Sequence, residues 1–161
     1  MDIYSFAFDM EKDSESYYRE LAEKCTNEGF KNILNMLADE ERKHQEYILE
    51  LQKNNKSNYI ESTILQDIKN IFAEMRDNKE DITINVSQLE LYKKAQELEK
   101  ESEEFYKEKA NEASNDEEKD ILIKLSKEEN KHYFLLENII EFVNRPQTWV
   151  ENAEFNHLDE Y

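Results

Sequence analysis

Glycine, proline and cysteine are almost absent from this sequence, since each occurs once in 161 residues. With so few residues that bend or break the chain, and with few β-branched runs, the composition predicts long helices. The lone Cys25 excludes an internal disulfide and a paired-cysteine metal site, so we expect it to pack as a small hydrophobic residue. The length is sufficient for one domain with a substantial core.

Basic residues are also scarce, because 21 Lys and Arg face 39 Asp and Glu. The formal net charge of −18 argues against binding to nucleic acid, and equally against an anionic membrane surface. No apolar run is long enough to cross a bilayer, and no basic segment precedes the first apolar residues as in a signal peptide. We therefore expect a cytoplasmic protein with a solvated acidic surface.

Four long segments carry apolar residues at helical spacing, and they cover about residues 2–26, 30–53, 87–114 and 116–144. The first is predicted to stop near Gly29, a residue type common at helix ends. Short turns join the first two segments and the last two, so each pair is predicted to form an antiparallel hairpin.

The connection between the two hairpins, about residues 54–86, contains apolar residues that predict a shorter helix between Ile64 and Met75. So long a crossover allows the second and third long helices to run parallel. This is the ferritin-like arrangement of an all-α four-helix bundle. We expect residues 1–145 to form this one domain.

The two predicted hairpins repeat each other at an offset of 88 residues. The stretch from Ala7, AFDMEKDSESYYRELA, lies over the stretch from Ala95, AQELEKESEEFYKEKA. In the same register, LADEERKH from Leu37 lies over LSKEENKH from Leu125. The sequence therefore contains one helical hairpin twice.

Polar residues interrupt the apolar stripe of each long helix at matching positions. In the second and fourth helices a Glu and a His three residues apart replace apolar residues, and in the first and third a single Glu does so. The six residues are Glu11, Glu41, His44, Glu99, Glu129 and His132. A buried carboxylate costs several kcal/mol without compensation, so four of them facing one another need a partner.

Two divalent cations would balance the four carboxylates, and residues three apart on a helix can converge on one ion. Carboxylate oxygen with imidazole nitrogen suits Fe, Mn or Zn. The pattern of one Glu from each of two helices and Glu-x-x-His from the other two is that of di-iron carboxylate bundles. The alternative is a bundle whose polar stripe is only structural. A further Glu-x-x-His, Glu154–His157, lies outside the four stripes and is interpreted as a surface pair.

On these residues the chain resembles the rubrerythrin-like branch of the ferritin-like superfamily over nearly its whole length. The resemblance implies that Glu41 and Glu129 bridge two metal ions, while the remaining four residues are terminal ligands. It also implies that Tyr18 and Tyr106 hydrogen-bond ligand carboxylates and orient them. The sequence lacks the paired cysteines of a rubredoxin domain, and Ser102 stands where such proteins carry an additional Glu.

The leading functional hypothesis is a non-haem di-iron oxidoreductase that reduces peroxide or O₂, with electrons from an external donor such as a rubredoxin-like protein. The cofactor would be two Fe ions, with Mn or Zn as alternatives. A second hypothesis is ferroxidase action with iron storage or transfer, and a third is a metal-free structural or interaction bundle. Metal content per chain distinguishes the three hypotheses.

The last segment, residues 146–161, contains several large apolar side chains, namely Trp149, Val150, Phe155, Leu158 and Tyr161. Such residues seldom stay exposed together, so we expect this tail to pack on the bundle or on a neighbouring subunit. A homodimer is predicted on that basis.

Overall fold

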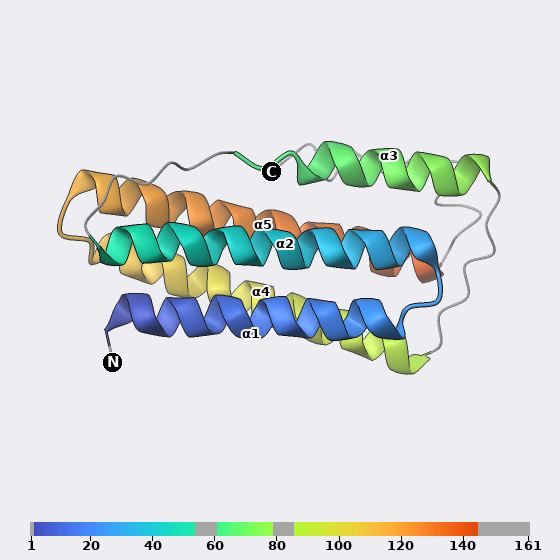
Figure 1. The fold of residues 1–161 in the computed structure, drawn as a ribbon, viewed down its shortest axis with the longest axis horizontal. Helices are drawn as coiled ribbons and strands as arrows, with labels where there is room; N and C mark the ends of the chain where they lie inside the picture. Colours follow the sequence, from blue (N-terminus) through green and yellow to red (C-terminus); the bar gives the residue numbers. More distant parts are fainter. Residues whose placement is uncertain (1, 54–60, 79–85, 145–161) are drawn as a thin grey trace.

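The computed structural model describes residues 2–53, 61–78 and 86–144. These residues form five helices, α1 Ile3–Lys24, α2 Glu28–Gln52, α3 Ile64–Asp77, α4 Val86–Asn111 and α5 Asp116–Asn144. Four of them form an all-α, ferritin-like bundle, and α3 lies in the crossover along its outside (Figure 1). The predicted fold is therefore confirmed, including the short crossover helix. The predicted tail, residues 146–161, lies outside the described residues.

The helices pair as the sequence repeat predicts, with α1 packed on α2 and α4 packed on α5. The colours in Figure 1 show that α2 and α4 run in the same direction, because the crossover carries the chain back along the length of the bundle. Among the described residues no helix is long and apolar enough to cross a membrane.

The turn between α1 and α2 differs from the prediction, because Gly29 does not end a helix. It lies in the first turn of α2, and Asn27 caps that helix by accepting a hydrogen bond from the backbone N–H of Phe30 at 3.0 Å. A Cβ on Gly29 would lie 2.5 Å from Sδ of Met75, a residue of α3. The glycine therefore allows α3 to approach the bundle closely.

Two apolar clusters fill the bundle. The larger includes Tyr18, the start of α2, the end of α5 and the inner side of α3, while the smaller includes Tyr106 and the opposite ends of the long helices. Within the larger cluster, Phe30 packs edge-on against both Phe72 and Phe142. Full burial of each such side chain contributes about 2 kcal/mol to folding. The predicted polar residues lie between these two clusters.

Candidate metal centre

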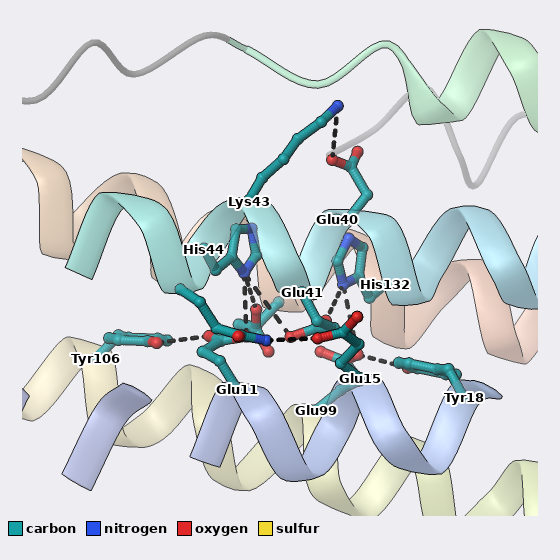
Figure 2. Close-up of polar contacts among 12 residues, drawn as sticks. Glu11, Glu15, Tyr18, Glu40, Glu41, Lys43, His44, Glu99, Tyr106 and His132 are labelled. Carbon is teal, nitrogen blue, oxygen red and sulfur yellow. Dashed lines mark hydrogen bonds and ion pairs between the residues drawn. The ribbon is translucent and has the colours of Figure 1, made fainter. Parts of the chain in front are cut away.

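Six polar side chains meet in the middle of the bundle (Figure 2). α1 and α4 contribute one carboxylate each, and α2 and α5 each contribute a carboxylate and an imidazole from adjacent turns. All six side chains are at most 2 % exposed: Glu11, Glu41, His44, Glu99, Glu129 and His132. The structure therefore brings together every residue that was predicted as a metal ligand. We call this set the carboxylate–histidine centre.

The centre consists of two overlapping groups that share Glu41 and Glu129. One group adds Glu11 and His44, and the other adds Glu99 and His132. Within each group, one potential ligand atom from every residue lies within 4.8 Å of the others. Two neighbouring positions with two carboxylates in common are the geometry that a pair of cations requires.

Each imidazole reaches across to the shared carboxylate of the other hairpin. Nδ1 of His44 lies 2.8 Å from Oε1 of Glu129, and Nδ1 of His132 lies 2.8 Å from Oε1 of Glu41. The two rings are nearly parallel, with centroids 5.8 Å apart and planes inclined by 6°. The arrangement thus repeats the symmetry of the sequence.

Two buried tyrosines fix the outer carboxylates. The hydroxyl of Tyr106 donates to Oε1 of Glu11, and the hydroxyl of Tyr18 donates to Oε1 of Glu99, both at 2.5 Å. Burial and the neighbouring carboxylates raise the pKa of both tyrosines well above its usual value, so they remain donors. Each tyrosine therefore orients the Glu of a different helix, in the way that outer hydrogen bonds orient metal ligands.

Burial and mutual repulsion divide the four carboxyls into two kinds. The pKa of Glu41 and Glu129 is raised well above the usual value by burial and by the charges of the other carboxylates. Burial alone would raise the pKa of Glu11 and Glu99 as well. The nearby imidazoles, with hydrogen bonds from the shared carboxyls and the tyrosines, instead hold it below its usual value. The metal-free centre therefore favours protonated shared carboxyls and ionised outer ones.

The imidazoles complete the charge balance. Although burial opposes their protonation, the carboxylate of Glu11 raises the pKa of His44 to about 9. The pKa of His132 is likewise raised, by the carboxylate of Glu99. The raised pKa of both imidazoles favours a positive charge on each ring, which offsets the negative charge of the outer carboxylates.

The donor set fits a pair of metal ions. When all carboxylates are ionised, four buried oxygens lack a hydrogen-bond donor: Oε2 of Glu41, Oε2 of Glu99 and both oxygens of Glu129. Oε1 of Glu129 is close to His44 but outside hydrogen-bonding geometry. Buried oxygens without partners are costly, and cations would satisfy them.

A surface pocket of about 390 Å³ lies between α1 and α4. Its lining includes Ser14 and Ser102, two buried serines that lie three residues after Glu11 and Glu99. Residues three apart share a helix face, so small side chains separate the pocket from the centre. This pocket is therefore one candidate approach to the centre for a small molecule.

Two other carboxylates near the centre differ in their environments. Glu103 is buried and forms ion pairs with Lys107 at 2.9 Å and Lys100 at 3.6 Å. Glu15 is less buried and accepts hydrogen bonds from Gln45 and Arg19. Neither belongs to the groups of potential ligands that the described residues form.

The sequence interpretation missed two buried carboxylates, Glu40 and Glu128, which precede the shared Glu41 and Glu129 by one residue. They form a third group with His132, in which one potential ligand atom per residue again lies within 4.8 Å of the others. The repeat contained a signal for them, because Glu40 aligns with Glu128 at the offset of 88 residues.

A bundle of four long helices with a crossover helix, enclosing a centre that fits metal binding, defines a ferritin-like protein. The sequence model of the rubrerythrin family matches residues 2–140, so the chain belongs to the rubrerythrin family. A solved structure of a hypothetical protein from Pyrococcus furiosus is 21% identical, with a TM-score of 0.61 and 88% of each chain covered. That likeness supports the fold alone. No curated protein matches the chain.

Proposed function

We propose that this protein is a non-haem di-iron oxidoreductase that reduces peroxide or O₂ with electrons from an external donor. The observation that carries the proposal is the pair of buried groups that share Glu41 and Glu129. Four carboxylates and two neutral imidazoles would balance two divalent cations and leave no net charge in the core. Iron is the metal proposed, with Mn or Zn as alternatives.

In this proposal Glu11 and His44 hold one ion, Glu99 and His132 hold the other, and Glu41 and Glu129 lie between them. Two Fe(II) ions held close together supply two electrons to one oxidant. The chain's own contribution is position and exclusion of water. The tyrosine hydroxyls fix the outer carboxylates, and complete burial keeps bulk water from the centre.

The oxidant is proposed to approach through the pocket between α1 and α4. The carboxylates of Asp9, Asp13 and Glu101 line this pocket together with Phe6 and Met10, so it favours small uncharged molecules over anions. Peroxide and O₂ are both of that kind. The 161 residues contain one cysteine and therefore offer no paired-cysteine iron site, so the electron donor is proposed to be a separate protein such as a rubredoxin-like one.

Anaerobic loading followed by single-turnover oxidation tests the proposal. The chain is loaded with Fe(II) without oxygen, its metal content is measured, and peroxide or O₂ is then added in separate stopped-flow experiments. We expect about two Fe per chain and faster oxidation by peroxide. A Glu41→Gln/Glu129→Gln variant should lose the metal, whereas Glu46→Gln, on the exposed side of α2, should retain it.

The possible results separate the competing functions. Faster oxidation by O₂, with continued uptake of Fe(II) beyond the centre, would favour the ferroxidase alternative. Failure to retain Fe, Mn or Zn, together with higher stability of the Glu41→Gln/Glu129→Gln variant, would favour a metal-free structural bundle and overturn the proposal.

A further inference from the structure

A third cluster of potential ligands lies on the side of the centre that faces α2 and α5. It consists of Glu40, Glu128 and His132, which are 6 %, 2 % and 0 % exposed. One potential ligand atom from each lies within 4.8 Å of the other two. We call these three residues the outer group. Two carboxylates and one imidazole are a ligand set that Mn, Fe, Co and Zn accept.

His132 belongs to both the centre and the outer group, and its two ring nitrogens lie in different surroundings. Nδ1 lies 2.8 Å from Oε1 of Glu41 and 3.4 Å from Oε1 of Glu99. Nε2 is buried and has no hydrogen-bond partner among the described residues. Figure 2 shows this second nitrogen turned away from the centre, toward the side of the helix where Glu40 lies. A buried imidazole nitrogen in that position calls for a ligand.

The carboxylates of the outer group form long ion pairs with two lysines. Nζ of Lys43 lies 3.6 Å from Glu40, and Nζ of Lys131 lies 3.5 Å from Glu128. Each lysine is three residues along the same helix, and the side chain of Lys43 is 60% exposed. The ammonium group of Lys43 can therefore move away at little cost when a stronger cation arrives, whereas the side chain of Lys131 is only 12% exposed.

A route from solvent leads to the outer group. A surface cavity of about 190 Å³ beside α3 has three carboxylates and one lysine in its lining, namely Asp39, Glu40, Asp67 and Lys43. Acidic residues that line a cavity concentrate cations there and accelerate their binding. Glu40 therefore lies both in the lining of this cavity and beside His132, so a cation that enters the cavity can reach the outer group.

We propose that the outer group is a transfer site that binds a divalent cation on its way to the carboxylate–histidine centre. The inference rests on the proposed metal-binding function. An ion that binds in the outer group displaces the proton of Nε2 of His132 into solvent, while Nδ1–H still donates to Glu41. Once an ion occupies Nδ1, Nε2 carries the hydrogen and donates to Glu40 or Glu128 instead. A neutral ring serves one site at a time, so the outer group empties as the centre fills.

The test compares rates of metal uptake, using Co(II) because its absorption spectrum reports coordination without a redox reaction. The Glu40→Gln/Glu128→Gln variant keeps the shape of the outer group and removes its charge. The control, Glu46→Gln/Glu117→Gln, removes two exposed charges from the same two helices. We expect the outer-group variant to load at least about tenfold more slowly than wild type, and the control to load at the wild-type rate. Both should reach the wild-type content of about two Co per chain.

Three results would overturn the inference. They are an unchanged loading rate in the outer-group variant, an equal slowing in the control, or a final content below that of wild type, which would place Glu40 and Glu128 in the centre itself. Failure of the wild-type chain to bind Co(II) would instead contradict the proposed function. Thermal unfolding of the metal-free proteins checks the fold, and if the double variant is unfolded, Glu40→Gln alone must still slow loading.

Discussion

The charge balance of the centre predicts that metal binding releases an unusual number of protons. In the metal-free chain, protons are favoured on the shared carboxyls Glu41 and Glu129, because their pKa is raised well above the usual value by burial and by neighbouring carboxylates. Protons are also favoured on His44, whose pKa is about 9, and on His132, whose pKa is raised as well. All four groups must lose a proton to serve as ligands.

The expected release near neutral pH is therefore about four protons per chain on loading with two ions. Each released proton makes the free energy of loading more favourable by about 1.4 kcal/mol per unit rise in pH. Four protons give about 5.5 kcal/mol per pH unit for the pair of ions. The release should decline as the pH approaches 9, because His44 is then already losing its proton.

Isothermal calorimetry with Zn(II), in two buffers that differ in their enthalpy of protonation, measures this number directly. The difference between the two apparent enthalpies gives the protons released, and Glu46→Gln should give the wild-type count. A release of about one proton or fewer, with two ions bound, would show that the carboxyls and imidazoles are already deprotonated in the empty centre. The account of a centre held neutral by protons would then be refuted.

Three further predictions follow from particular contacts. The free energy of unfolding of the metal-free chain, measured in urea, should decrease from about pH 6 to about pH 9. The reason is that groups whose pKa is raised on folding, such as His44 and Glu41, stabilise the fold only while they are protonated. A free energy of unfolding that increases over this range would contradict the prediction. Tyr106→Phe should weaken metal binding about tenfold or more in competition with a chelator, whereas Tyr17→Phe, which loses a hydrogen bond to the backbone of Leu91, should not. Gly29→Val should lower stability by about 2 kcal/mol, seen as a lower Tm, without changing metal content, because its side chain would overlap Met75.

Much of the fold and of the centre could be predicted from the sequence, because both depend on periodicity. Glu41 and His44 occupy inward positions of a 3.6-residue repeat, so their burial follows once the segment is known to be a helix. The repeat at an offset of 88 residues then gives Glu129 and His132 without further assumption. The start of α2 was harder to predict, because a glycine such as Gly29 is common both at helix ends and at close contacts between helices. In the structure Asn27 caps α2, so Gly29 lies inside that helix and makes a close contact.

Burial outside the inward stripe depends on neighbouring helices and could not be predicted from one helix at a time. Glu40 and Glu128 each lie one residue before a shared carboxylate, about 100° around the helix, where a solvated face is the ordinary expectation. Both are buried, and Glu40 lines a cavity together with Thr63, Ile64 and Asp67 of the crossover. The resemblance implied that Tyr18 and Tyr106 hydrogen-bond ligand carboxylates, but it did not say which helix supplies each carboxylate, and in the structure each tyrosine contacts a carboxylate of another helix.

These contacts explain why the repeat needs both of its copies. The shortest contact of each imidazole and the hydrogen bond of each tyrosine all join one hairpin to the other, as in His44 with Glu129 and Tyr106 with Glu11. The contact of His44 with Glu11 inside its own hairpin is longer, at 3.3 Å. Each hairpin supplies three of the four residues of one ligand group and one residue of the other group, so a single hairpin completes neither group and cannot bury its carboxylates alone. The centre exists only when the hairpins have docked, so metal binding should stabilise their docking more than the helices within either hairpin.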